Sequence, residues 1–162
     1  MSQVLDKKLF YEIQQFRQRW IWLIILIVVI ALFIPIIIGV LNIFLSIVLF
    51  LFGFAFIWLF YHMSLVTEVK ETGIQITFTP FTNFLIPLNE IKNYEIREYR
   101  PILEYGGWGI RFNRTGKAYT VSGTIGLQLE LLNGKKILIG TEIPDTLFNE
   151  LDKLINKKKS YC

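Results

Sequence analysis

The pattern of hydrophobic and polar positions divides the chain into three parts. From Trp20 to Tyr61 the chain has 42 consecutive residues without a charged side chain. Before this run lie 19 residues with a basic balance, and after it about 100 residues in which apolar and polar positions alternate. Because about 20 apolar residues cross the hydrocarbon core of a membrane as a helix, a run of this length predicts two spans.

The middle of the apolar run predicts where the chain reverses. Pro35, Gly39 and Asn42 interrupt it, so we expect helices at residues 20–38 and 41–61. The length argues against a cleaved signal peptide, whose apolar core is about 7–15 residues. Trp and Tyr favour the headgroup level, because an apolar ring carries a polar N–H or O–H. The predicted interface anchors are Trp20, Trp22, Trp58 and Tyr61.

Small and polar residues recur on one face of each predicted span. Small residues allow close backbone approach in a bilayer, where no hydrophobic force drives helices together. The pattern predicts packing of the two spans against each other, with contact between copies of the chain as the alternative. Neither span carries the polar stripe that a conducting pore needs. The predicted packing face consists of Ala31, Pro35, Gly39, Asn42, Ser46 and Gly53.

Positive charge near the spans predicts their orientation. Four basic residues precede the first span, whereas the reversal has none. Because Lys and Arg are enriched in cytoplasmic flanks, we expect both termini in the cytoplasm. The chain is therefore expected to be a multi-pass membrane protein. The four basic residues are Lys7, Lys8, Arg17 and Arg19.

The lead at residues 1–19 has apolar positions at helical spacing. Leu5, Leu9, Ile13, Phe16 and Trp20 follow one another at intervals of three or four residues. This spacing predicts an amphipathic basic helix. Such a helix could lie in the membrane interface, pack on the domain that follows, or continue into the first span.

Period-two alternation predicts a mainly β domain at residues 62–162. The clearest strand is Thr124–Leu132, and the Asn133–Gly134 pair that follows it favours a type I′ hairpin turn. The first strand begins within a few residues of Tyr61, so the domain is expected to lie close to the membrane. The other predicted strands are 65–70, 74–79, 84–87, 93–100, 108–113, 118–122 and 136–140.

One amphipathic helix is predicted at the end of the chain, at about residues 144–157. Pro144 suits the first helical position, and the three lysines at 157–159 suit the C-terminal end of the helix dipole. About eight short antiparallel strands followed by one helix favour a strongly bent sheet or open barrel, with the helix over one open end.

Three segments carry a resemblance to a known family. GGWGIRFN (106–113) and the segment from TIGLQLELLNG to the IPDTL helix start (124–155) resemble bacterial members of the pleckstrin-homology-like superfamily. FYEIQQFR (10–17) ahead of two spans is similar to small two-pass bacterial membrane proteins of uncharacterised function. The resemblance implies a pleckstrin-homology-like domain on an inner-membrane anchor, with no assigned reaction. The loop at 79–83 lacks the basic residues that inositol phosphates require in that superfamily.

Composition excludes several kinds of chemistry. The net charge is +4, but residues 62–162 carry thirteen basic and eleven acidic side chains, including the three lysines at 157–159. Without those lysines the balance is 10 − 11 = −1, which argues against nucleic-acid binding. Cys162 and His62 are single residues of their types, and no metal-ligand spacing appears. We therefore expect no metal, no cofactor and no enzymatic activity.

The most distinctive local cluster is the GGWG sequence at 106–109. Glycines beside a Trp can admit a ligand or a peptide backbone, or can serve a tight turn. The candidate binding residues are Gly107, Trp108 and Arg111. Nearby, arginines at 97, 100, 111 and 114 alternate with glutamates at 95, 98 and 104. These charges predict a solvated face with cross-strand pairs, or alternatively a site for an acidic partner.

These observations predict a non-enzymatic membrane protein that presents a cytosolic binding or scaffolding domain. The expected partners are the lipid bilayer and either another protein or a second copy of the chain. Two alternatives remain. The hairpin could be the active part of a membrane complex, or the domain could sense membrane lipid.

Overall fold

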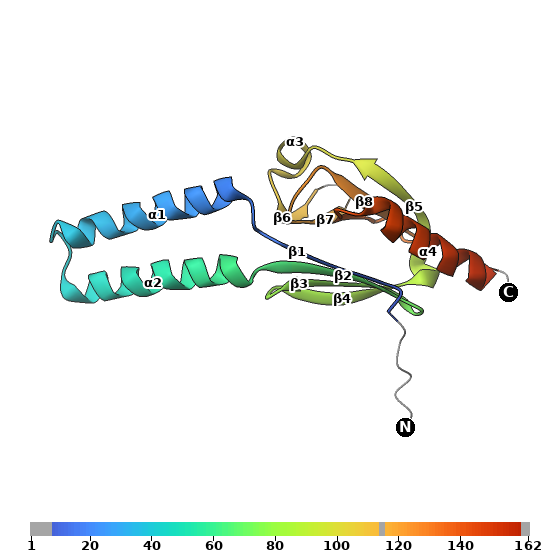
Figure 1. The fold of residues 1–162 in the computed structure, drawn as a ribbon, viewed down its shortest axis with the longest axis horizontal. Helices are drawn as coiled ribbons and strands as arrows, with labels where there is room; N and C mark the ends of the chain where they lie inside the picture. Colours follow the sequence, from blue (N-terminus) through green and yellow to red (C-terminus); the bar gives the residue numbers. More distant parts are fainter. Residues whose placement is uncertain (1–7, 114–115, 160–162) are drawn as a thin grey trace, which may run out of the picture. The chain divides into compact units, whose positions relative to one another are not determined.

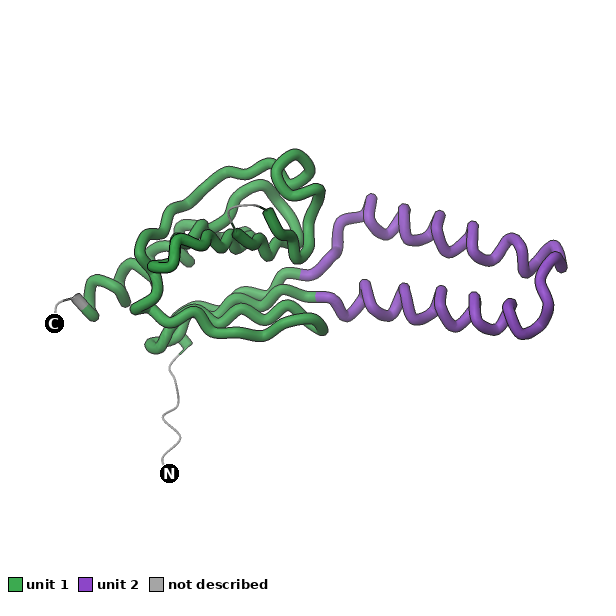
Figure 2. Tube along the Cα trace, turned by 180° about the vertical axis from the view of Figure 1, so that it is seen from behind, with its two compact units in different colours: residues 1–14, 64–162 green, residues 15–63 purple. Residues whose placement is uncertain are grey.

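Two compact units make up the structure, a computed structural model that describes residues 8–113 and 116–159. Residues 15–63 form one unit, and residues 1–14 with 64–162 form the other (Figure 2). We call them the hairpin unit and the β unit. The prediction of two long apolar helices followed by a mostly β domain is confirmed. The β unit is nevertheless built from two separate stretches of sequence.

Two helices form the hairpin unit. Helix α1 spans Arg19–Ile37, helix α2 spans Ile43–His62, and each is long and apolar enough to cross a membrane. Nineteen residues of α-helix are about 28 Å long, close to the ~30 Å hydrocarbon thickness of a bilayer. Gly53 is buried, and a Cβ there would lie 3.3 Å from Cε2 of Phe33. The two helices therefore pack against each other at this glycine.

The reversal lies between Ile37 and Ile43. Gly39 has φ +72°, a left-handed conformation that a side chain would disfavour. Asn42 caps α2, because its Oδ1 accepts a hydrogen bond of 2.9 Å from the backbone N–H of Leu45. Two residues that interrupt the apolar pattern thus end one helix and begin the next.

Four strands form the first sheet of the β unit, in the order β1-β2-β3-β4 (Figure 1). Strands β2 and β3 pair with Ser64 opposite Thr79, and β3 and β4 pair with Gly73 opposite Pro87. The strands are β1 Phe10–Gln15, β2 Ser64–Lys70, β3 Gly73–Thr79 and β4 Thr82–Pro87.

Strand β1 corrects the prediction for the lead. Phe10, Glu12 and Gln14 are buried and the residues between them are exposed, which is a period of two rather than the predicted helical period. The backbone N–H of Leu9 donates to the carbonyl oxygen of Val69 at the far end of β2. Since β1 starts where β2 ends, the two neighbours are antiparallel. The lead is a strand because β2 supplies a hydrogen-bonding edge that local spacing does not reveal.

Five strands form the second sheet, in the order β5-β8-β9-β7-β6. A short 3-10 turn, η1 (Leu88–Glu90), precedes it, and the five-residue helix α3 (Pro101–Tyr105) follows β5. The strands are β5 Ile91–Glu98, β6 Gly109–Phe112, β7 Gly116–Thr120, β8 Ile125–Leu131 and β9 Lys136–Gly140.

The second sheet corrects two further expectations. Strands β7 and β9 are parallel, because the β8–β9 hairpin inserts between β5 and β7. The strands form two separate sheets rather than one bent sheet or open barrel. In the hairpin turn, Gly134 has φ +78° and no residue other than glycine has a positive φ among the described residues. The turn is therefore not type I′, which needs positive φ at both central positions.

Helix α4 (Pro144–Lys159) covers the β5 and β8 side of the unit. Leu147 and Leu151 are fully buried. The hydroxyl of Tyr94 on β5 donates to Oδ1 of Asp152 at 2.6 Å, and its ring lies 5.3 Å from that of Phe148. Burial, with the Asp152 hydrogen bond, raises the pKa of Tyr94 to about 12. The core between sheets and helix includes Leu65, Ile74, Ile76, Phe78, Leu127, Leu129 and Ile139.

Side chains from β1 also reach the second sheet. Glu12 is 9% exposed, and its Oε2 accepts 2.6 Å from the Thr141 hydroxyl while its Oε1 accepts 2.8 Å from the Glu142 backbone N–H. Gln14 donates to the same Oε1 at 3.0 Å and to the Gly140 carbonyl oxygen at 2.8 Å. The strand that precedes the hairpin is thus tied to the end of β9.

Candidate functional site

The candidate site lies on the face of the second sheet that turns away from the first. Strand register places one residue from each strand in a row across this face. From β6 to β5 the row is Arg111, Ala118, Leu138, Gln128 and Glu95. The row is apolar in the middle and polar at both ends, and α3 adjoins it. These strands therefore present a polar surface with a small apolar floor.

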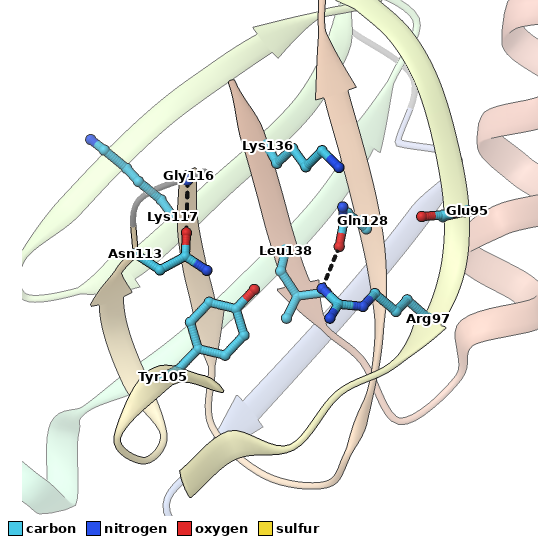
Figure 3. Close-up of a pocket in the computed structure, with 9 residues that line it drawn as sticks. All are labelled: Glu95, Arg97, Tyr105, Asn113, Gly116, Lys117, Gln128, Lys136 and Leu138. Carbon is cyan, nitrogen blue, oxygen red and sulfur yellow. Dashed lines mark hydrogen bonds between the residues drawn. The ribbon is translucent and has the colours of Figure 1, made fainter. Parts of the chain in front are cut away.

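An open pocket of about 280 Å³ lies on this face (Figure 3). Its lining combines three basic side chains, one acidic side chain, neutral polar groups and a leucine. All five strands except β6 contribute, together with α3 and the β6–β7 turn. The lining residues are Glu95, Arg97, Tyr105, Asn113, Gly116, Lys117, Gln128, Lys136 and Leu138.

Arg97 is held in place from two sides. Its Nη1 donates to Oε1 of Gln128 at 2.7 Å, as the dashed line in Figure 3 shows, and its Nη2 forms an ion pair with Glu104 on α3. Glu104 also accepts a hydrogen bond of 2.8 Å from the backbone N–H of Arg100. The guanidinium is therefore fixed at the pocket wall, and Glu104 already balances its charge.

Lys136 is not held in this way. In the part of the chain that the structure describes, its ammonium makes neither a hydrogen bond nor an ion pair. Figure 3 shows it reaching across the pocket toward Gln128. Lys117 instead turns outward, with its Nζ 5.2 Å from the ring centroid of Phe112. Glu130, opposite Lys136 in the β8–β9 pair, interacts with its charge but is hydrogen-bonded to Lys92. An ammonium without a hydrogen-bonded acceptor, in the same pocket as a fixed guanidinium, suits an anionic group.

A glycine allows β7 to approach β9 at the pocket. A Cβ at Gly116 would lie 1.8 Å from the carbonyl oxygen of Lys136, which no side chain can accommodate. The Gly116 N–H donates to Oδ1 of Asn113 at 2.8 Å, and the Asn113 N–H donates to the Gly116 carbonyl oxygen at 3.0 Å. This turn places Asn113 at the rim and brings the backbone of Lys136 beside β7.

Aromatic residues close one side of the pocket. Tyr99 and Leu138 are almost fully buried against Ala118, and Tyr105 packs on this cluster. The Tyr99 and Tyr105 rings meet edge to face with centroids 6.1 Å apart. Burial raises the pKa of Tyr99 to about 12. The floor is thus closely packed, and the Tyr99 phenol is neutral at physiological pH.

The structure places Gly107 and Trp108 in the α3–β6 turn and Arg111 close by on β6. Gly107 has φ +124°, so the turn itself requires the glycine. Trp108 is half-buried, and its Nε1 donates to the Gly123 carbonyl oxygen at 3.0 Å. Nε of Arg111 donates to the Trp108 carbonyl oxygen at 3.1 Å. Arg111 belongs to the row across the sheet, but none of the three lines the pocket.

The predicted membrane residues take several different positions. Trp22 donates its Nε1–H to the Phe16 carbonyl oxygen at 2.8 Å, whereas Trp20, Trp58 and Tyr61 are exposed at helix ends. Of the predicted packing face, Gly53 is buried and Pro35 and Ser46 are half-buried. Ala31 is exposed, and Gly39 and Asn42 lie in the reversal.

Several pocket residues were not singled out from the sequence. Gln128 and Lys136 belong to clear strands, but their outward-facing positions resemble ordinary solvated ones. Arg97 was assigned to cross-strand pairs, whereas its acidic partner Glu104 comes from α3. Arg114, from the same charged group, lies outside the described residues. The sequence offered a signal for Asn113, because Asn followed by Gly three residues later is typical of a tight turn.

Comparison of the chain with protein-family models, with curated proteins and with solved structures gave no match. Within residues 8–113 and 116–159, no three His, Cys, Asp or Glu side chains gather as metal ligands would. The fold and site define a class: a chain with two helices able to cross a membrane and a two-sheet β unit with a basic, polar pocket.

Proposed function

We propose that this chain is a membrane-anchored binding protein whose β unit takes up an anionic group in the pocket on the second sheet. One observation carries the proposal: Lys136 and the fixed guanidinium of Arg97 line one pocket on either side of Gln128, and within the described residues the Lys136 ammonium makes no hydrogen bond or ion pair. A charged donor with no internal partner gains a charge-assisted hydrogen bond when an anion arrives. The protein acts by binding, without a reaction or cofactor.

The bound group belongs to a protein partner, a second copy or a small molecule. Its carboxylate or phosphate would bind the Lys136 ammonium on the Arg97 side of the pocket, while the Tyr105 hydroxyl offers a further hydrogen bond. Glu95, on the same strand as Arg97, disfavours a large polyanion such as nucleic acid. A pocket of about 280 Å³ accommodates a single charged group rather than a large ligand.

The anchor and the domain family are part of the same proposal. We infer a bacterial inner membrane with both termini in the cytoplasm, supported by the basic residues that flank α1 and their absence from the reversal. We also infer a pleckstrin-homology-like origin for the β unit, supported by strands that precede a single closing helix. Reporter fusions at the two ends test the orientation, and an external C-terminal reporter would contradict it.

Charge reversal at Lys136 tests the pocket. Full-length protein in detergent would be heated with increasing inorganic phosphate, succinate or an acidic peptide. A ligand that binds only the folded state raises the unfolding temperature as its concentration exceeds Kd. Wild type should show this shift, and Lys136→Glu should lose it. Lys135→Glu makes the same change at an exposed turn residue and is the matched control.

Two results would contradict the proposal. In one, none of the three anions raises the unfolding temperature of the wild type when sodium chloride keeps the total ionic strength constant. In the other, the two charge-reversal variants lose the shift equally, which would indicate a general electrostatic effect rather than a site.

A further inference from the structure

A second surface of the β unit carries large apolar side chains that are mostly exposed, although the ring of Phe81 lies 6.3 Å from that of Phe78. Phe81 is 57% exposed, and Ile102 and Leu103 on α3 are 69% and 77% exposed. Phe81 lies in the β3–β4 turn, and α3 follows β5, so these residues come from different sheets. Side chains of this kind usually cover a core or meet an apolar partner.

Strand pairing places both loops at one end of the β unit. Ser64, the first residue of β2, pairs with Thr79, so the Phe81 turn lies beside the start of β2. Gln14, near the end of β1, donates to the carbonyl oxygen of Gly140 at the end of β9. The Gly140 end of β9 pairs with the start of β8, and Ile125 there pairs with Glu98 at the end of β5.

The loop that holds α3 stays at that end. Tyr99 donates its N–H to the Thr124 carbonyl oxygen at 2.7 Å, and Trp108 donates to Gly123 at 3.0 Å. The loop is thus fastened to the β7–β8 connection on both sides of α3. Figure 1 shows α3 and the β3–β4 turn at the same end of the β unit.

Chain connectivity brings this end close to the membrane. Three residues separate the end of β1 from α1, and Met63 alone separates α2 from β2. Three extended residues reach about 10 Å. The headgroup layer on each side of a bilayer is roughly 5–8 Å thick. The end of the β unit from which both connections leave therefore cannot lie far outside the headgroup layer.

We propose that this end of the β unit rests on the lipid surface, with Phe81, Ile102 and Leu103 inserted among the headgroups. Burying an exposed Phe or Leu side chain contributes favourably, and the spans already hold the domain at the surface. Arg100, exposed beside α3, offers a cation to lipid phosphate. This lipid contact does not depend on the anion pocket, and it adds to the membrane anchoring by the two spans.

The far end of the second sheet supplies a matched control. Leu132, in the β8–β9 hairpin, is 67% exposed, almost as much as Leu103. It lies at the opposite end of β8 from Ile125. A leucine of similar exposure therefore occurs at both ends of the β unit, and only Leu103 should contact lipid.

The test places a fluorophore at each position in the full-length protein. In a Cys162→Ser background, the variants Phe81→Cys, Leu103→Cys and Leu132→Cys are labelled with an environment-sensitive dye. They are reconstituted in vesicles of phosphatidylcholine and phosphatidylglycerol. Labels at 81 and 103 should show blue-shifted emission, lose most of their fluorescence to nitroxide-bearing lipids and resist iodide. The label at 132 should respond to iodide alone.

Two outcomes would overturn the lipid contact. Labels at 81 and 103 that behave like the label at 132 would show this end in water. Labels at 81 and 103 that resist both iodide and nitroxide lipids would show that protein covers the surface. Circular dichroism of each variant, matched to wild type, establishes that the labelled proteins are folded.

Discussion

Glu12 on β1 connects the segment before the hairpin with the end of β9 through hydrogen bonds to its carboxyl group. It accepts three hydrogen bonds, from Thr141, Glu142 and Gln14. Hydrogen bonds to a buried charged group are worth about 1.5–3 kcal/mol each, and an unsatisfied partner is costly. The stability of β1 therefore depends on a contact 129 residues away in sequence.

Replacing the hydroxyl that meets Glu12 should destabilise the β unit. Thr141→Val keeps the shape but leaves Oε2 without its donor, which should cost about 1–3 kcal/mol. For a domain of this size, that lowers the unfolding temperature by roughly 5–20 °C. Thr124→Val is the control, because Thr124 is exposed and its hydroxyl makes no hydrogen bond within the described residues. Equal melting temperatures for the two variants would contradict the prediction.

Tyr94 should make stability depend on alkaline pH. Its pKa is about 12 in the folded protein, against about 10 in an unfolded chain. Because the folded-state pKa is raised, its contribution is fully present below pH about 10 and is lost as pH rises toward 12. Tyr94→Phe should flatten the decline of melting temperature in this range. Tyr11→Phe removes the hydroxyl of an exposed tyrosine and is the comparison variant.

At the scale of elements, β1 shows how two periodicities compete in one segment. Apolar residues at 5, 9, 13 and 16 have helical spacing, yet the buried side chains are Phe10, Glu12 and Gln14. A helix at this place would leave β2 as an edge strand with unpaired backbone groups. Pairing with β2 satisfies them, and Glu12 and Gln14 then reach polar partners on the second sheet.

Alanine substitutions on opposite faces of β1 test whether this segment is a strand or a helix. Phe10 is 5% exposed, so Phe10→Ala should cost about 3–5 kcal/mol. Ile13, which the helical pattern would bury, is half exposed, and Ile13→Ala should cost about 1 kcal/mol or less. The comparison uses thermal unfolding of full-length protein in detergent. A larger effect at Ile13 than at Phe10 would refute the strand.

At the scale of the whole molecule, the hairpin unit is an insertion between two neighbouring strands. Residues 15–63 leave the β unit after β1 and return at β2, which lies next to β1 in the sheet. The antiparallel arrangement of β1 and β2 means that a short turn could join them directly. We therefore expect the β unit to fold without the spans between these strands.

Removing the insertion should yield a soluble domain. Replacing residues 15–63 with Asn-Gly converts β1 and β2 into a β-hairpin with a favoured two-residue turn. The shortened protein should remain in solution without detergent and show the dispersed amide spectrum of a folded β domain. A variant that also lacks residues 1–14 loses the Glu12 and Gln14 contacts and should be less stable. Aggregation or collapsed spectra of the first variant would contradict independent folding.

The candidate site was only partly predictable. Gly107, Trp108 and Arg111 form an unusual cluster in the sequence, and they lie in the α3–β6 turn and the strand that follows it, outside the pocket lining. Lys136 and Gln128 gained meaning only from strand order, because β8 and β9 place them in the pocket that Arg97 and α3 also line. Outward-facing charged residues on a strand look alike until their neighbours are known.

The sequence by itself determined the local features of this protein. The two apolar helices, the strand–turn alternation after them and the closing helix follow from residue spacing, since each depends on residues only a few positions apart. The tertiary structure alone decided the features that join distant residues: β1 as a strand, the parallel β7–β9 pair, two sheets rather than one barrel, and the Lys136 pocket. The physical reason is that β pairing satisfies hydrogen bonds between segments far apart in the chain, and periodicity does not specify the partner.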